Sequence, residues 1–276
     1  MHKLIRISYL ALIVIAFSFC KDSEKADENL VDENDTKNAV QETKLNAQNV
    51  FNSMPDRKEI LILIEDHKIE YNSDLLSDPG VVHKYNLESS KAANLGIYGS
   101  DLSIASSFEQ TQESMVFLKC VNLLANDLGV SSAFDAKMVD RMEANKQNKD
   151  STLEIITNAF KSADEILKNS NRPATSAIIL AGAWIEGLHV SCQIAKNLNS
   201  EAIVKSILKQ KESLKNLIVL LDAANITEGS MYIVNDLKNL QVAFKVAEEN
   251  NTFTNDNIKD IISTAEALRR KIISGL

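Results

Sequence analysis

Apolar residues beyond position 45 recur mostly at intervals of three and four, which is the period of an α-helix rather than that of a strand. The 276 residues include only three prolines, and Pro55, Pro79 and Pro173 each stand where a helix is expected to begin or end. No Asn-Gly or Asp-Gly turn lies between alternating apolar runs, so no β-hairpin is expected. Because the expected linkers are short, the sequence predicts an all-α fold, a single multi-helix bundle of mostly antiparallel helices.

The helical pattern divides the chain at its polar and glycine-containing linkers. The expected helices cover residues 36–53, 57–68, 81–107, 109–128, 132–147, 151–169, 173–197, 201–225, 230–248 and 255–274. Residues 60–64 are β-branched enough for a strand, but no second such run exists to pair with them, so a helix is favoured, followed by a loop over 74–80. Residues 151–154 read Ser-Thr-Leu-Glu, which predicts a capping box. Further expected caps are Ser131 or Ser132, Asn199 or Ser200, and Thr254 at N-termini, and Gly129 at a C-terminus.

The overall charge and the cysteine content exclude some classes of protein. The chain carries 30 Lys and Arg against 38 Asp and Glu, a net charge of −8, so no nucleic-acid partner is expected. Three cysteines cannot make a disulfide framework. Cys120 and Cys192 lie mid-helix among apolar residues and are expected to be small core side chains; a disulfide between them requires Cα atoms within about 7 Å.

Residues 1–19 have the pattern of an export signal. Lys3 and Arg6 precede an apolar run over residues 7–17, which is too short for a stable transmembrane helix. Cys20 follows directly, and this placement resembles a bacterial lipoprotein signal, in which that cysteine is lipidated. An uncleaved N-terminal anchor and an ordinary secreted protein are the alternatives. Loss of the two positive charges of the signal would change the net charge from −8 to −10.

The residues after Cys20 predict a tether rather than a folded element. Residues 21–44 hold eight acidic and four basic side chains and no aromatic one, so they cannot bury enough apolar surface to fold. Residues 21–24, Lys-Asp-Ser-Glu, look like the signal that sends lipoproteins of Bacteroidota to the outer face of the outer membrane; a plain solvated tether is the alternative. The expected domains are therefore a signal (1–19), a lipidated cysteine with an acidic tether (20–44) and a helical domain (45–276).

Two expected helices carry small residues along one face. Gly99, Ser103 and Ser107 are spaced by four in one, and Ala183, Gly187 and Ser191 in the other, so the two helices are expected to pack on each other. Gly96 and Gly99 are unfavourable inside a helix and require a packing or functional reason. Asp101 lies among these small residues, where it is either a site carboxylate or, as favoured, bonded to a backbone group or hydroxyl.

Residues 177–195 are apolar nearly all round, which predicts a buried central helix. Glu186 and His189 are its ionisable residues, and their i, i+3 spacing places them on one side. This pair matches half of the Glu-x-x-His metal motif of ferritin-like bundles, but the sequence holds no second copy. The favoured interpretation is a mutually hydrogen-bonded core pair; a ligand-pocket pair and a metal site are the alternatives.

Several polar and aromatic residues are candidates for a shared ligand pocket between these helices. They are Tyr98, Asp101, Gln110, Glu113, Trp184, Glu186 and His189. The favoured interpretation of residues 109–113 is a solvated first turn, and a polar cavity lining is the sharper alternative. The sequence has no nucleophile elbow and no Walker, Rossmann, EF-hand or zinc-finger spacing, so no cofactor is expected.

Three segments of the domain resemble a family of uncharacterised lipoproteins of Bacteroidota. They read ANLGIYGSDL at 93–102, QTQE at 110–113 and GAWIEGL at 182–188. The resemblance implies a helical, exported, lipid-anchored protein on the outer membrane, and it assigns no catalytic residue. We expect a non-enzymatic module that binds a small molecule or protein. The alternatives are a metal-dependent enzyme built on Glu186 and His189, and a structural component of the cell envelope.

Overall fold

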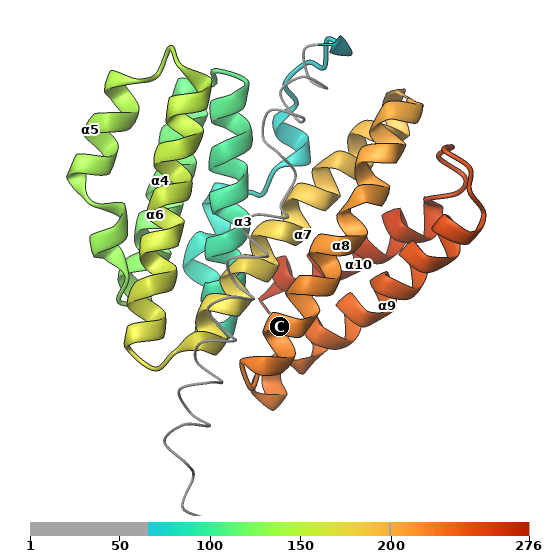
Figure 1. Cartoon of the computed structure of the whole chain (residues 1–276). Helices are drawn as coiled ribbons and strands as arrows, with labels where there is room; N and C mark the ends of the chain where they lie inside the picture. The colour runs from blue at the N-terminus through green and yellow to red at the C-terminus, as the bar shows by residue number, and fades with distance from the viewer. Residues whose placement is uncertain (1–65, 199, 276) are drawn as a thin grey trace, which may run out of the picture.

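The computed structural model describes residues 66–198 and 200–275, which form one helical bundle with no strand among them (Figure 1). Its α-helices are α3 (Glu88–Ser107), α4 (Thr111–Asp127), α5 (Ala136–Ala144), α6 (Lys149–Asn169), α7 (Pro173–Leu198), α8 (Glu201–Ala223), α9 (Met231–Glu249) and α10 (Lys259–Ser274). Short 3₁₀ turns are η1 (Ser73–Leu75), η2 (Pro79–Lys84), η3 (Ser131–Phe134) and η4 (Glu228–Ser230). The predicted all-α bundle is confirmed. The signal, Cys20, the tether, the expected helix 36–53 and residues 57–65 of the expected helix 57–68 lie outside the described residues.

The bundle is organised around the contact of α3 with α7. Helices α4 and α6 pack on one side of this pair, and α8 and α10 pack on α7, with α9 bridging them (Figure 1). Ala93 lies beside Gly182, and Ser100 lies beside Gly187 seven residues further on, so the two helices run in the same direction. The central pair of helices is therefore parallel.

Glycine allows the α3 and α7 backbones to touch. A Cβ added at Gly96 would lie 2.0 Å from the carbonyl oxygen of Ile179, and one added at Gly182 would lie 1.9 Å from that of Ala93. The predicted packing of the two helices is therefore confirmed, and the packing reason required of Gly96 is found. Gly99 has a different reason, because a Cβ there would meet the ring of Phe160 on α6 at 2.1 Å.

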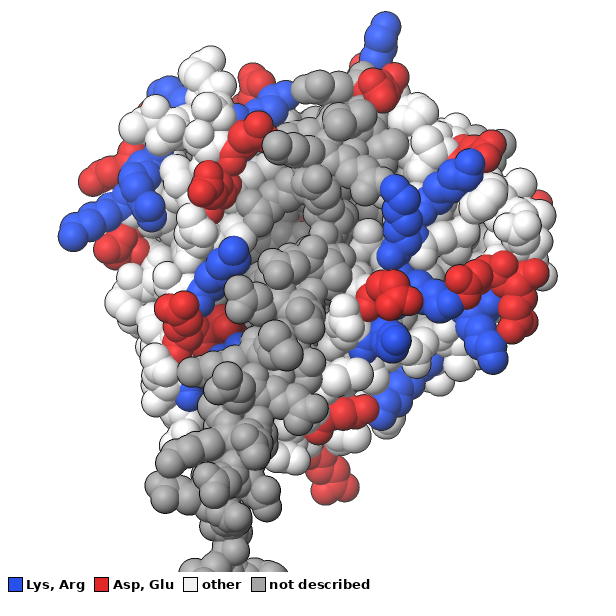
Figure 2. Space-filling model, viewed as in Figure 1, with Lys and Arg blue, Asp and Glu red and all other residues white. Residues whose placement is uncertain are grey.

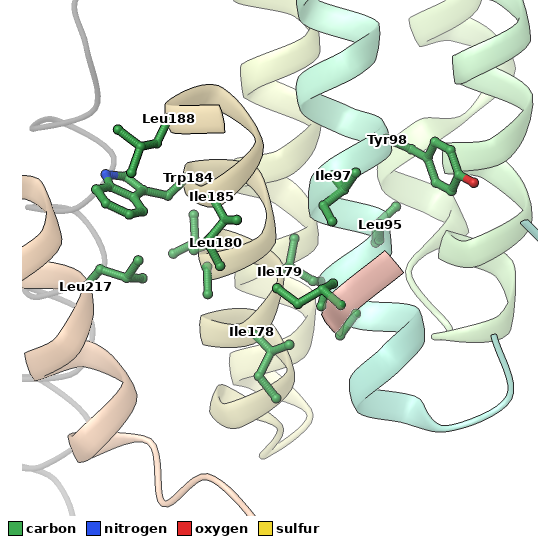
Figure 3. Packing of buried hydrophobic residues seen from close by; sticks show 14 of the residues in the cluster. Leu95, Ile97, Tyr98, Ile178, Ile179, Leu180, Trp184, Ile185, Leu188 and Leu217 are labelled. Atoms are coloured by element: carbon green, nitrogen blue, oxygen red, sulfur yellow. The ribbon is translucent and has the colours of Figure 1, made fainter. Parts of the chain in front are cut away.

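Apolar side chains of these two helices form the centre of the core (Figure 3). Leu95, Ile97 and Ile185 are at most 1% exposed. Most of α7 is buried, although its length and composition alone would allow it to cross a membrane. This burial is expected of a central core helix. Cys120 and Cys192 are buried free thiols, so they are core side chains and not a disulfide.

The predicted N-terminal caps of α5, α6 and α10 were wrong, because each of these helices begins at a different residue from the one predicted. The Asn148 side chain accepts a hydrogen bond from the Ser151 N–H, so α6 begins before the predicted capping box. Asp135 caps α5, while the predicted cap residues Ser131 and Ser132 lie in η3. Thr254 precedes the start of α10 by five residues. Gly129, with φ +73°, follows the end of α4 as predicted.

Candidate functional site

A buried ion pair joins the middle of α7 to α10. Glu186 is fully buried, and both its oxygens accept hydrogen bonds from Arg269, from Nε to Oε2 at 2.6 Å and from Nη2 to Oε1 at 2.7 Å. The planar guanidinium matches a carboxylate in this two-bond geometry, which an imidazole cannot reproduce. The predicted hydrogen-bonded pair of Glu186 and His189 was therefore wrong: the partner of Glu186 is Arg269, which sequence reasoning missed.

Asp101 of α3 completes this cluster as a second, fully buried carboxyl group. Its Oδ2 accepts a hydrogen bond from the Ser77 backbone N–H at 3.1 Å, as the favoured interpretation of a backbone partner predicted. Burial, and then the charge of Glu186 and a hydrogen bond with it, raise the pKa of Asp101 well above its ordinary value. Its Oδ1 is buried and has no hydrogen-bond partner among the described residues. The surroundings of Asp101 therefore favour its protonated, neutral form beside the charged pair.

The segment before α3 crosses over this cluster, and we name residues 72–85 the N-terminal strap. Arg269 Nη2 donates to Ser77 Oγ at 3.1 Å and reaches the Leu75 carbonyl oxygen at 3.5 Å. One residue beyond Ser77, the Asp78 carbonyl oxygen accepts a hydrogen bond from the Tyr98 hydroxyl at 2.8 Å. The polar side chains of α3 and α10 therefore hold the strap by its backbone and by Ser77.

His189 is buried one turn beyond Glu186 and stands outside the hydrogen-bonded cluster. Its Nδ1 has no hydrogen-bond partner among the described residues. Burial, and then the positive charge of Arg269, lower the pKa of His189 to about 4. The imidazole is therefore neutral at physiological pH and adds no charge to the cluster.

The other residues predicted for a shared pocket have separate partners. Trp184 Nε1 donates to Ser213 Oγ on α8 at 2.8 Å, on the far side of α7 from α3 (Figure 3). Gln110 Nε2 donates to the Phe108 carbonyl oxygen at 3.0 Å in the turn after α3. Glu113 accepts a hydrogen bond from the Tyr71 hydroxyl. The structure thus brings together only Asp101 and Glu186 of the predicted set as direct neighbours.

A groove of about 460 Å³ opens beside the C-terminal ends of α3 and α7. Its third wall is the segment over residues 68–76, which precedes α3 in the chain. Its apolar lining consists of Ile69, Tyr71, Leu75, Leu76, Ile104, Phe108, Val190, Ile194 and Leu198. Polar groups are few and include Lys68, Glu70, Asn72 and Asn197. The lining comes from three segments far apart in the sequence, so no single motif indicates it.

The groove and the buried cluster follow the same helix faces. Asp101 lies three residues before Ile104 on α3, and Glu186 lies four residues before Val190 on α7. Leu76 lines the groove and is followed directly by Ser77 of the cluster. The carboxyl groups of Asp101 and Glu186 therefore lie below the inner end of the groove. Asp101 contacts the strap next to Leu75 and Leu76, which form one wall of the groove.

The cluster does not have the features of a metal centre. Within residues 66–198 and 200–275, no group of three or more His, Cys, Asp or Glu side chains is placed to hold a metal ion. A cation bound by Glu186 would have to displace Arg269 from both carboxylate oxygens. No protein-family model, curated protein or solved structure matches the chain.

Proposed function

We propose that this protein is an exported, lipid-anchored binding module whose groove takes a small apolar or amphiphilic molecule. The observation that carries the proposal is the apolar groove of about 460 Å³ between α3, α7 and the preceding segment. Its volume is within the range of small-molecule sites, and apolar walls with a few polar groups are typical of such sites. A wider depression of about 520 Å³ beside α5 and α6 is lined mostly by polar and charged side chains and fits this function less well.

The placement of the carboxyl groups supports binding rather than chemistry. Asp101 and Glu186 are both 0% exposed and held by Ser77 and Arg269, so a molecule in the groove does not reach them while the strap is in place. The metal-dependent alternative needs the ion pair to open first. Nucleic acid is not a proposed partner, because the net charge is −8 and Lys and Arg lie among Asp and Glu on the face in Figure 2.

Binding of the neutral fluorophore N-phenyl-1-naphthylamine to residues 21–276 tests the groove. We expect saturable one-to-one binding that Ile194→Asp weakens by tenfold or more, since a carboxylate then replaces an apolar wall group worth about 1.5–3 kcal/mol. Val242→Asp on α9 is the matched control, because Val242 is 62% exposed, and it should leave the affinity unchanged. Absence of saturable binding, or equal loss in both variants, would contradict the proposal and favour a structural envelope component.

The membrane anchor is proposed from the sequence and lies outside the described residues. Residues 1–19 would be the signal, Cys20 the lipid acceptor and residues 21–44 the tether that holds the bundle off the outer membrane. Acyl chains on Cys20 would anchor the protein stably, at about 0.8 kcal/mol for each buried CH₂ group.

Metabolic labelling with a fatty-acid analogue tests the anchor. Labelling should disappear in Cys20→Ala and persist in Cys120→Ala, because Cys120 is a buried thiol of the bundle. Label retained by the Cys20→Ala protein would overturn the lipoprotein assignment.

Membership in the Bacteroidota lipoprotein family that the chain resembles is part of the same proposal. Two of its three resembling segments, 93–102 and 182–188, meet at the α3–α7 contact. They contain Gly96 and Gly182 of that contact and Asp101 and Glu186 of the cluster. The segments that carry the resemblance therefore meet in the fold.

A further inference from the structure

The N-terminal strap is held over the cluster by a small number of polar bonds and by the buried side chains of Leu76, Val82 and Tyr85. It contains two short 3₁₀ turns and no α-helix. Over the cluster, Ser77 bonds to Asp101 and Arg269, and the Asp78 carbonyl oxygen accepts from Tyr98. Weaker attachments follow at its other end, where Cys120 donates to the Pro79 carbonyl oxygen at 3.9 Å and the Tyr85 hydroxyl to that of Ile273 at 3.4 Å. The α3–α7 contact beneath it is backbone against backbone. Displacing the strap therefore breaks fewer contacts than separating the helices.

We propose that the Asp101–Glu186–Arg269 cluster is a proton-dependent switch, which holds the strap closed while the two carboxyl groups share one proton and releases it when that proton is lost. The switch would regulate access to the groove. It rests on the proposed binding function only in assuming that the groove holds a small molecule. Leu75 and Leu76 are both strap residues and groove walls, so release of the strap alters the groove directly.

The charge balance of the cluster explains the switch. With one proton on the carboxyl pair, Glu186 and Arg269 cancel each other and Asp101 is neutral. Loss of the proton leaves two buried carboxylates facing one guanidinium, so the cluster carries one uncompensated negative charge. A buried charge without a partner is costly, so this charge is stabilised only if water reaches it. Ser77 covers the pair from the strap side and is itself 8% exposed, so water reaches the pair most easily where the strap lifts.

The groups around Asp101 leave it as the residue that titrates. The ionisable groups that interact with it are Glu186 on α7, Arg269 on α10, Cys120 on α4, Tyr98 on α3 and Tyr71 before the strap. Burial raises the pKa of Cys120 to about 11 and raises those of both tyrosines further, so these three stay neutral. Glu266 lies near Arg269 on α10. Burial opposes ionisation of its carboxyl group, but hydrogen bonds from Lys196 and Gln193 outweigh burial and lower its pKa. Glu266 therefore stays charged. His189 is neutral, as described above.

Hydrogen exchange of the full chain purified in detergent tests the switch without any ligand. After correction for the intrinsic exchange rate, protection of the amides of residues 72–78 should fall as the pH rises above 5, by up to about tenfold for each pH unit until the folded-state pKa of Asp101 is passed, and should then level off. In Asp101→Asn, which keeps an oxygen acceptor for Ser77 and cannot ionise, protection should not change with pH. Asp236→Asn, on α9 and paired with Lys271, is the matched control and should behave as the wild type does.

The outcomes separate this proposal from the binding function. Amides of α8 and α9 should keep their protection throughout, which excludes global unfolding as the cause. Strap protection that is independent of pH, or that falls equally in Asp101→Asn, would overturn the switch even if the groove binds its fluorophore. A pH-dependent strap in a protein that binds no fluorophore would uphold the switch and overturn the binding function alone.

Discussion

Replacement of Glu186 by leucine is expected to lower the free energy of unfolding by about 3–5 kcal/mol, measured by denaturant titration. The loss arises because Arg269 is only 9% exposed and would be left charged without its bidentate partner. Asp101 can release its proton and take over as the counter-ion, which places the expected loss at the lower end of this range above neutral pH.

Two further variants isolate the buried charge as the cause. Glu186→Leu combined with Arg269→Met removes both charges, and the double variant should regain most of the stability lost by Glu186→Leu alone. Asp236→Ala breaks a more exposed pair with Lys271 and should cost no more than about 1 kcal/mol. A Glu186→Leu protein as stable as the Asp236→Ala protein would refute the structural importance of the cluster.

Alanine substitutions at two glycines of α7 are expected to change stability in opposite directions. Gly182→Ala should lower the free energy of unfolding by about 2–3 kcal/mol, because the new Cβ would lie 1.9 Å from the Ala93 carbonyl oxygen. That oxygen belongs to the backbone of α3, so no side-chain rotation relieves the contact and the two helices must move apart.

Gly187→Ala is the matched substitution on the same helix. Its new Cβ would have the Ser100 hydroxyl oxygen, at 4.0 Å, as its nearest neighbour, so no atom has to move. The higher helix propensity of alanine should then stabilise the protein by up to about 1 kcal/mol. Thermal or denaturant unfolding of the two variants checks this, and a change of the same sign in both would contradict the close α3–α7 contact.

The parts of the fold that depend on local patterns were predictable. Small residues on α3 and α7 predicted their contact, since four-residue spacing within one helix is visible in the sequence. The sequence did not reveal which small residues touch: Gly99 turned out to face Phe160 of α6. That choice depends on the rotation of each helix in the bundle, which the spacing alone does not determine.

The site was predicted only in part because its contacts join distant segments. Asp101 and Glu186 stood out as polar residues among small and apolar ones. Arg269 is 83 residues from Glu186, and a search for partners within α7 could not find it. A signal did exist, because Arg269 follows Ile262 and Ala265 on the apolar face of α10, where an arginine requires a buried partner. The groove needs three separate segments and has no comparable signal.

The pH dependence of stability in the wild type and in Asp101→Asn tests most directly the claim that a protonated carboxyl group lies at the centre of this fold. The pKa of Asp101 is raised in the folded state, so the folded protein binds its proton more tightly than the unfolded chain does. Its contribution to stability is complete below the unfolded pKa of about 3.9 and is lost as the pH rises through the folded pKa.

The two unfolding curves should therefore differ in a specific way. The free energy of unfolding of Asp101→Asn minus that of the wild type should be smallest near pH 4 and should rise with pH, at up to about 1.4 kcal/mol for each pH unit, until the folded pKa is passed. Titration of the other groups contributes to both proteins and cancels in the difference. A difference that stays constant from pH 4 to pH 9 would show that Asp101 is ionised like a surface aspartate, and would contradict the account.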